Sequence, residues 1–120
     1  MNIQFLGATG GEVTGSKVMI TTVNGKKILL DCGTYQGKGL ETDAMNRDLG
    51  FNPEEIDILL LSHAHIDHSG LIPYICKKGF KGKIYCTHAT NKVSVSCRYT
   101  FLSRSQNSHI SAKTRSTGRC

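Results

Sequence analysis

The fold is decided by the stretch Ile56-Asp57-Ile58-Leu59-Leu60-Leu61-Ser62-His63-Ala64-His65-Ile66-Asp67-His68-Ser69-Gly70. Its first part is a near-continuous apolar run of strand length, which is typical of a β-strand covered on both faces. Three histidines and an aspartate follow directly after this strand. Because sites in α/β folds lie at the carboxyl ends of the strands, the stretch predicts an α/β fold with a functional site at this edge.

The histidine cluster has the composition of a metal site. His63 and His65 are two residues apart, so in an extended backbone their side chains point the same way and can bind one ion. Asp67 and His68 follow where the chain turns into the next helix, and they are placed to reach a second ion. Imidazole nitrogen and carboxylate oxygen suit zinc, and also manganese or iron. We therefore predict a metal site, rather than a polar loop that is rich in histidine by chance.

These four residues do not complete two metal shells, because a catalytic zinc takes about three protein ligands and a water molecule. The remaining histidines are His88, after an expected strand, and His109, near the end of the chain. We expect neither to be a ligand.

Upstream of the cluster, the sequence predicts a strand over residues 2–6 and a hairpin of residues 17–23 and 26–31. Asn24-Gly25 between the two hairpin strands indicates a type I′ turn, in which both central residues have positive φ. The glycine-rich residues 7–11 lack the pattern of a phosphate-binding loop, so we expect a tight loop there. Asp31 ends the hairpin and is either a turn residue or a group aimed into a site.

Downstream elements complete one side of an α/β sandwich. We expect a loop or partly helical excursion over residues 32–50 and a short helical turn at Asn52-Pro53-Glu54-Glu55. Ser69 can cap a helix that runs through residues 71–76 and stops at Gly79, and a strand follows at 82–86. The expected order is hairpin, strand, metal loop, helix and strand.

Composition limits the class of protein. The 120 residues, with a net charge of +6, are enough for one domain. All the acidic residues precede residue 91, and residues 91–120 carry the whole excess of positive charge together with many Ser and Thr residues. Such a tail could contact phosphates, but we favour a segment that cannot bury a core. Cys32, Cys76 and Cys86 lie in apolar surroundings and are expected to be reduced core residues.

No signal peptide or membrane-spanning run is recognisable, since the longest apolar run is Ile58-Leu59-Leu60-Leu61. We therefore expect a cytoplasmic protein without a membrane partner.

The sequence resembles a known family in several segments. His63-Ala64-His65-Ile66-Asp67-His68 is similar to the H-x-H-x-D-H motif of the metallo-β-lactamase superfamily, and Asp31 matches its upstream aspartate. More narrowly, the β-CASP branch of RNA-processing nucleases is resembled by Gly11-Glu12-Val13-Thr14-Gly15-Ser16, by Tyr35-Gln36-Gly37, by Gly82-Lys83-Ile84-Tyr85-Cys86-Thr87 and by Ala89-Thr90. The resemblance covers residues 1–90.

The resemblance implies a role for each matching residue. His63 and His65 would bind one zinc ion, and Asp67 and His68 would bind the second, with Mn²⁺ as another possible metal. Asp67 is also the candidate catalytic residue, and Asp31 would orient a ligand imidazole by hydrogen bonding. In the family a metal-bound hydroxide attacks the phosphorus of RNA, so RNA is the implied substrate.

The resemblance also implies parts that are not found in this sequence. The family takes a further histidine, a later bridging aspartate and an inserted β-CASP domain, so we expect an incomplete αββα sandwich containing only its first half. Resemblance and composition both change near Asn91, so we expect a truncated chain whose residues 91–120 are disordered or read out of frame. Self-association, or pairing with the missing remainder, could complete the site.

Two alternatives remain beside a weakly active or inactive portion of a zinc ribonuclease. One is a non-catalytic fragment that binds metal or RNA, with the basic tail on phosphates. The other is a generic esterase or thioesterase of the metallo-β-lactamase fold, against which residues 12–16 argue.

Overall fold

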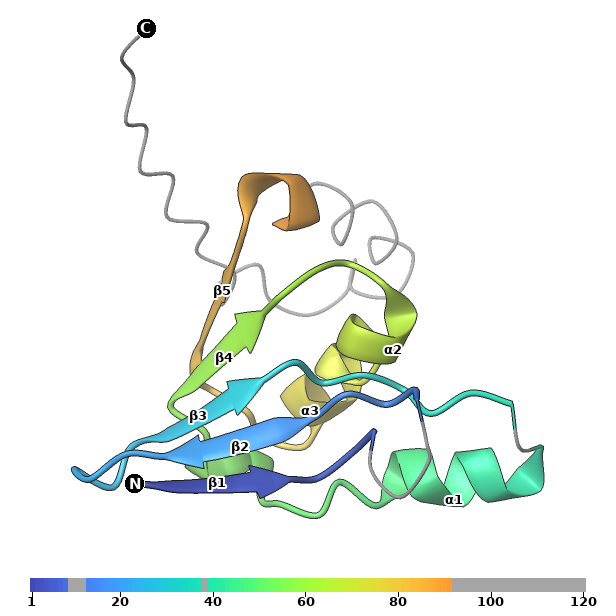
Figure 1. Ribbon diagram of the computed structural model, residues 1–120, viewed down its shortest axis with the longest axis horizontal. Helices are drawn as coiled ribbons and strands as arrows, with labels where there is room; N and C mark the ends of the chain where they lie inside the picture. Colours follow the sequence, from blue (N-terminus) through green and yellow to red (C-terminus); the bar gives the residue numbers. More distant parts are fainter. Residues whose placement is uncertain (9–12, 38, 92–120) are drawn as a thin grey trace, which may run out of the picture.

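A computed structural model of the protein describes residues 1–8, 13–37 and 39–91 and shows an α/β fold built on one five-stranded sheet (Figure 1). The strands lie side by side in chain order: β1 (Asn2–Phe5), β2 (Val18–Thr21), β3 (Lys27–Leu30), β4 (Ile58–Leu61) and β5 (Lys83–Cys86). The helical elements are α1 (Leu40–Arg47), the 3₁₀ turn η1 (Pro53–Glu55), α2 (Ile66–Ser69) and α3 (Ile72–Lys77). Residues 88–91 are also helical.

The sheet is mixed, and β2 runs opposite to the other four strands. β1, β2 and β3 pair antiparallel, whereas β4 is parallel both to β3 and to β5. The connection from β4 to β5 passes through α2 and α3, as a crossover between parallel strands requires. The predicted order of hairpin, strand, loop, helix and strand is confirmed, and it brings the carboxyl ends of β3, β4 and β5 to one edge. The loop after β4 is the predicted metal loop, and its binding of metal stays a prediction.

The β2–β3 hairpin closes through a different turn from the one predicted. Gly25 has a positive φ of 76°, but Asn24 is not among the described residues with positive φ, so the turn is not type I′. Instead, Gly25 N–H donates to the Thr22 carbonyl at 3.0 Å and Thr22 N–H donates to the Lys26 carbonyl at 2.9 Å. This is a three-residue loop that ends in a positive-φ glycine, the next most common hairpin closure.

One face of the sheet carries the hydrophobic core. Met19, Leu29, Leu59 and Ile84 occupy one row across β2 to β5 and are all buried. Helix α3 packs on this side, and the remaining buried apolar residues of the core cluster include Leu61, Ile72, Ile75 and Phe80. Cys32 belongs to the same core, as expected, whereas Cys76 is exposed and the expectation for it was wrong.

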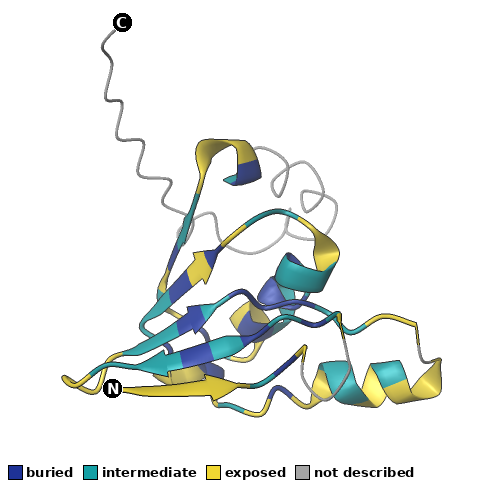
Figure 2. Cartoon of the chain, in the orientation of Figure 1, coloured by how far each residue is buried: buried dark blue, intermediate teal, exposed yellow. Residues whose placement is uncertain are grey.

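The opposite face of the sheet is apolar and lacks a covering layer among the described residues (Figure 2). We call it the open face, and strand register gives its apolar and aromatic members: Ile3, Phe5, Val18, Ile20, Ile28, Leu30, Ile58, Leu60 and Tyr85. None of them is fully buried, and the Phe5 and Leu60 residues are 69% and 38% exposed. The prediction that β4 is covered on both faces is therefore wrong for the described residues, although its apolar composition suits such a strand.

The helix after the metal loop begins later than predicted. Ser69 ends α2, and its hydroxyl donates to the Ala64 carbonyl at 3.1 Å, so it does not cap α3. Leu71 is the N-cap of α3. The predicted stop at Gly79 is confirmed, because Gly79 has a φ of 98° and its N–H donates to the Cys76 carbonyl. Phe80 N–H donates to the Ile75 carbonyl, and the two bonds together form a Schellman motif.

The predicted turn at Asn52 is also confirmed. The Asn52 side chain accepts a hydrogen bond from Glu54 N–H, and Pro53 occupies the first helical position of η1. Asp57 then links this region to β3, because its Oδ2 accepts from Lys27 N–H at 2.9 Å and its Oδ1 accepts from Lys26 Nζ at 3.2 Å. These bonds lower the pKa of Asp57, the backbone bond most of all. They fix the register of β3 against β4 at the end of the sheet remote from the histidines.

Lys17 is an unexpected member of the interior. Its residue is 0% exposed, and its Nζ is a buried polar atom without a hydrogen-bond partner. The ammonium lies 4.7 Å from the centre of the Tyr35 ring, which compensates only in part for lost hydration. Burial lowers the pKa of Lys17 from its ordinary value of 10.5.

No helix among the described residues has the length and apolar character needed to span the bilayer. The expectations for residues 91–120 concern a segment that, apart from Asn91, lies outside the described residues. They include the expectations for His109 and for the basic tail, and they stay predictions.

Replacing Lys17 with Met should stabilise the fold, because the thioether side chain fills similar space without an unpartnered charge. We expect Lys17→Met to raise the free energy of unfolding at pH 7 by about 1–3 kcal/mol, measured by urea denaturation. Lys81→Met, at an exposed position, is the matched control and should change stability by less than about 0.5 kcal/mol.

The pH dependence gives a second readout for the same variant. The folded-state pKa of Lys17 is lowered, so between that pKa and 10.5 the unfolded chain binds a proton that the folded chain does not. Stability therefore rises with pH through this window in the wild type, and Lys17→Met should lack this rise. A Met variant less stable than the wild type, with the rise retained, would contradict the account.

Candidate metal centre

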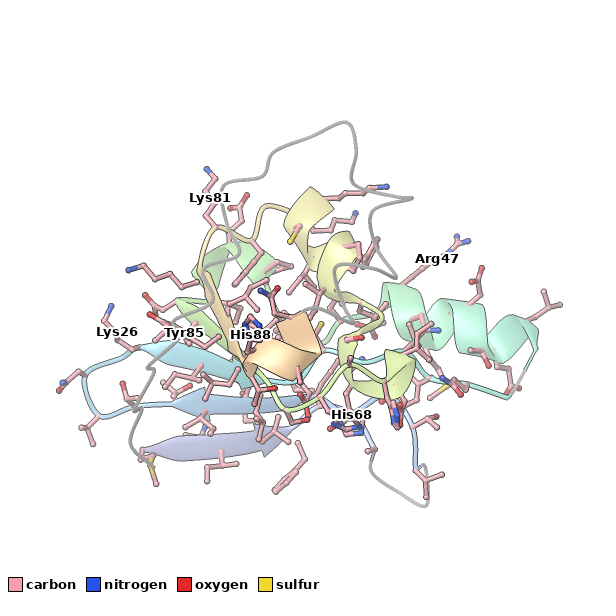
Figure 3. All side chains as sticks on the ribbon, turned by 90° about the horizontal axis from the view of Figure 1, so that it is seen from above. Lys26, Arg47, His68, Lys81, Tyr85 and His88 are labelled. Carbon is pink, nitrogen blue, oxygen red and sulfur yellow. The ribbon has the colours of Figure 1, made fainter. Side chains whose placement is uncertain are left out.

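The histidine cluster lies on the loop that leaves β4 at the carboxyl edge of the sheet. His63 and His65 belong to the extended segment before α2, and His65 is the N-cap of that helix with φ −60° and ψ 148°. Asp67 and His68 lie within α2 itself. His68 lies beyond the carboxyl ends of β3 and β4, whereas Lys26 and Lys81 lie at the opposite end of the sheet, before β3 and β5 (Figure 3).

The structure brings the four predicted metal ligands together. The ring centres of His63 and His65 are 4.7 Å apart with an edge-on geometry, and those of His63 and His68 are 4.0 Å apart. Asp67 Oδ2 lies 3.5 Å from His68 Nε2. His68 and Asp67 keep about a quarter of their side-chain surface exposed, so the cluster is partly accessible from solvent.

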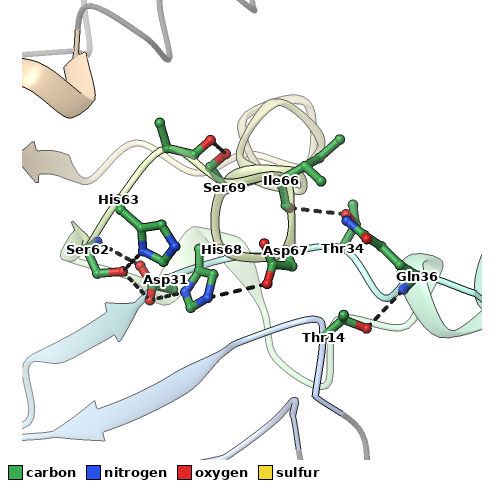
Figure 4. A network of polar contacts seen from close by, with 11 residues as sticks. Thr14, Asp31, Thr34, Gln36, Ser62, His63, Ile66, Asp67, His68 and Ser69 are labelled. Carbon is green, nitrogen blue, oxygen red and sulfur yellow. Dashed lines mark hydrogen bonds and ion pairs between the residues drawn. The ribbon is translucent and has the colours of Figure 1, made fainter.

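Asp31 lies beneath the cluster and is buried (Figure 4). Its φ of 59° is in the left-handed region, which Asp tolerates better than most residues. The carboxylate accepts from Ser62 N–H, from the Ser62 hydroxyl and from His68 Nδ1, each at 2.8 Å. The structure thus places Asp31 within hydrogen-bond distance of His68, a predicted ligand.

Ser62 extends this network to a second imidazole. Its hydroxyl oxygen lies 2.9 Å from His63 Nδ1 while it donates to Asp31. Asp31, Ser62, His63 and His68 are therefore connected by hydrogen bonds that use the Nδ1 atom of each ring. The Nε2 atoms of His63 and His68 take no part in these bonds.

Backbone hydrogen bonds hold the predicted metal loop against the segment after β3. Cys32 N–H donates to the His68 carbonyl at 2.8 Å, and Thr34 N–H donates to the Ile66 carbonyl at 3.1 Å. Ser16 joins both segments, since its N–H donates to the Asp67 carbonyl and its carbonyl accepts from Gly33 N–H. The loop that carries the predicted ligands is thus held by two other segments of the chain, residues 32–34 and Ser16.

Gly33 makes this close approach possible. A Cβ atom at Gly33 would lie 1.5 Å from the Asp67 carbonyl oxygen and 2.6 Å from His68 N. Both neighbours are backbone atoms of α2, so they cannot move aside without displacing the loop. Position 33 therefore requires glycine for a steric reason.

The other segments that resemble the β-CASP branch pack together next to these backbone hydrogen bonds. Gln36 N–H donates to Thr14 Oγ1 at 3.1 Å, and the Tyr35 ring packs where a Cβ on Gly15 would lie, 2.8 Å away. Asn46 of α1 binds both the N–H and the carbonyl of Tyr35. Gly11 and Glu12 of the first segment lie outside the described residues.

The donor set fits zinc in its chemistry, because it offers three imidazoles and one carboxylate. Within the described part of the chain, however, no three His, Cys, Asp or Glu side chains already form a group able to hold an ion. His88 is exposed on the helical turn after β5, whereas His68 belongs to α2 (Figure 3). His109 lies outside the described residues.

Two structural contributors were not predicted from the sequence. Ser62 stands directly before the first histidine, at the end of β4. This position in the sequence is the signal that could have suggested its role. Gly33 follows Asp31 closely, but its contact with Asp67 depends on a fold that no local pattern reveals.

Comparison with known families gives one clear match. The family model described as "Metallo-beta-lactamase superfamily" matches residues 11–104.

Two curated relatives are similar over more than half of the chain. The chain is 44% identical over 79 residues to "Ribonuclease TTHA0252" of Thermus thermophilus, covering 66% of this chain and 18% of that protein. It is 39% identical over 95 residues to "Cleavage and polyadenylation specificity factor 73" of Drosophila melanogaster, covering 78% of this chain and 13% of that protein. The chain thus spans less than a fifth of the length of these relatives.

Solved structures show the same fold. BJP-1, a subclass B3 metallo-β-lactamase of Bradyrhizobium japonicum, matches with a TM-score of 0.55 and 24% identity, covering 77% of this chain and 32% of that one. MIM-1 of Novosphingobium pentaromativorans also gives a TM-score of 0.55, at 23% identity and over 79% and 32% of the two chains. At this identity the likeness concerns the fold alone, and it confirms the predicted fold class over part of the family's architecture.

Substituting Gly33 should disrupt the metal loop. We expect Gly33→Ala to lower the free energy of unfolding by about 2–4 kcal/mol, because its methyl group collides with backbone atoms, as measured by urea denaturation. Gly37→Ala is the control: Gly37 has a φ of 98° but open space around it, so the cost should be only about 1–2 kcal/mol. Equal stability of the two variants would show that the close approach to Asp67 is not a constraint.

Proposed function

Because the chain belongs to the metallo-β-lactamase superfamily, we propose that it is a portion of a zinc-dependent hydrolase that cleaves the phosphodiester bonds of RNA. One observation carries this proposal: His63, His65, Asp67 and His68 gather at the carboxyl edge of the sheet, on a loop held by Asp31. Metal-assisted hydrolysis is the chemistry that such a donor set supports.

RNA is favoured as the substrate by the relatives rather than by the site. The two relatives described above carry names that refer to ribonuclease activity and to cleavage and polyadenylation. The β-lactamases among the solved structures are less similar in sequence, below 25% identity, and support only the fold. The segments that resemble the RNA-processing branch also contact each other through Thr14, Gly15 and Tyr35, beside the loop that carries the histidines.

Each residue of the cluster has a proposed role. His63 and His65 would hold one zinc ion, and Asp67 and His68 would hold the second. Bound zinc would act as a Lewis acid toward the scissile phosphate and would activate water as the nucleophile. Asp67, which has one carboxylate oxygen beside His68, is also the proposed catalytic residue, and Asp31 orients His68 through Nδ1.

The proposed sites require ligands beyond these four residues, because each pair supplies two donors where about three are needed. We propose that they come from protein outside the described residues, or from a second copy of the chain. The open face is where a second layer of the sandwich would pack, since its two apolar rows run across β1 to β4 and one of them continues to Tyr85 of β5.

Zinc binding by the chain tests the cluster directly. Competition with a chelating dye should show zinc bound by the wild type, and we expect His65→Ala to weaken this binding by at least about 10-fold, because one donor of a predicted pair is lost. His88→Ala is the matched control, since His88 is an exposed histidine on another element, and it should leave zinc affinity unchanged.

Substrate class is tested with the same proteins. In the presence of zinc, we expect slow cleavage of a fluorophore-labelled RNA that EDTA stops and that His65→Ala reduces at least about 100-fold. A thioester and a chromogenic β-lactam should not be hydrolysed. Preferential hydrolysis of either compound would contradict RNA as the substrate, and zinc affinity insensitive to His65→Ala would contradict the cluster as the metal centre.

A further inference from the structure

Ser62 lies between the buried carboxylate and the first histidine of the cluster. Although Ser62 itself is exposed, its backbone N–H and its hydroxyl both donate to Asp31, at 2.8 Å each. Its hydroxyl oxygen is also 2.9 Å from His63 Nδ1. A single side chain thus contacts both the acceptor below the cluster and an imidazole within it.

The directions of these hydrogen bonds follow from the number of available protons. An ionised carboxylate only accepts, so the one hydroxyl proton of Ser62 points to Asp31. The short contact between Ser62 Oγ and His63 Nδ1 is then a hydrogen bond only if Nδ1 carries a proton. In a neutral imidazole the lone pair is left on Nε2, the nitrogen that takes no part in the network.

His68 also needs a proton on Nδ1, because this atom contacts Asp31 directly and not through a serine hydroxyl. Its Nδ1 lies 2.8 Å from Asp31 Oδ2, so Nδ1 donates and Nε2 keeps the lone pair. Asp67 Oδ2 lies 3.5 Å from His68 Nε2, which is too long for a good hydrogen bond, so the shorter bond to Asp31 decides which ring nitrogen carries the proton. Asp31 therefore controls the tautomer of His68 directly and that of His63 through Ser62.

We propose that Ser62 is a positioning residue that transmits the hydrogen-bond requirement of Asp31 to His63, so that one buried carboxylate selects the Nδ1–H tautomer of one imidazole in each predicted metal pair. The consequence for metal binding depends on the proposed function, because it assumes that His63 and His68 are ligands. The tautomers themselves are a property of the metal-free chain.

The tautomers are measured without metal or substrate. Long-range ¹H–¹⁵N correlation spectra of the metal-free, ¹⁵N-labelled chain distinguish Nδ1–H from Nε2–H rings, with signals assigned from single His→Gln variants. At about pH 8.5, well above the ordinary histidine pKa of about 6.5, we expect the Nδ1–H form for both His63 and His68. A free imidazole favours Nε2–H, so the wild-type spectrum already departs from the default.

Two substitutions separate a positioning role from a structural one. Ser62→Ala removes the acceptor, and His63 should revert to mainly Nε2–H while His68 keeps Nδ1–H. Ser62→Thr restores a hydroxyl and should restore the wild-type spectrum of His63. Thr34→Val is the matched control, since the Thr34 hydroxyl donates to the Ile66 carbonyl of the same loop, and it should leave both tautomers unchanged.

Zinc affinity gives the functional readout. We expect Ser62→Ala to weaken zinc binding by about 10–100-fold, as for other groups that orient a ligand imidazole, and Ser62→Thr to stay within about threefold of the wild type. An Nε2–H His63 in the wild type, or an unchanged His63 in Ser62→Ala, would overturn the proposal. If the tautomers behave as expected but no variant binds zinc, the proposed metal centre fails and the transmission through Ser62 stands.

Discussion

The carboxylate of Asp31 is the constraint on which the geometry of the site depends. It is buried at the end of β3, and it accepts hydrogen bonds from the N–H and the hydroxyl of Ser62 and from His68 Nδ1. Satisfying a buried carboxylate in this way avoids a desolvation cost of several kcal/mol. The strand that ends at Asp31 and the loop that carries the histidines are therefore bound to each other through the groups that orient the histidines.

Sheet register makes this meeting possible. Leu30 pairs with Leu60 in the parallel β3–β4 ladder, so Asp31 follows β3 at the level where β4 passes into Ser62. At the other end of the same strands, Asp57 binds Lys26 and Lys27 and holds the register. Because a slip of one residue would turn every side chain to the opposite face, the site and the core are specified by the same pairing.

Much of this arrangement could be predicted from local patterns. The apolar run and the Asn24-Gly25 pair correctly indicate the strand β4 and the β2–β3 hairpin, although the turn is not type I′ and one face of β4 is open among the described residues. The four residues of the histidine motif lie close together, and their binding of metal stays a prediction. Longer-range features could not be predicted in this way. The tight contact of Gly33 with Asp67 and the burial of Lys17 both depend on segments that meet only after folding. The helix start at Leu71, rather than at a cap on Ser69, reflects the use of Ser69 in closing α2.

The open face and the proposed metal sites, which need further donors, have one possible common explanation in the proposal that the chain is a portion of a larger fold. A sheet face with nine apolar or aromatic positions that no other described residues cover gains free energy by packing against another layer. The predicted ligands gain by acquiring further donors. Both needs would be met by the remainder of a two-layered sandwich, of which this chain spans about a third in the solved β-lactamase structures.

X-ray absorption at the zinc edge tests the central claim most directly, because it reports the atoms that bind the metal in the loaded chain. The account predicts a shell of nitrogen and oxygen at about 2.0–2.1 Å, with the outer scattering pattern of imidazole rings. A shell dominated by sulfur at about 2.3 Å would place the metal on the cysteines instead and would contradict the histidine cluster as the metal centre.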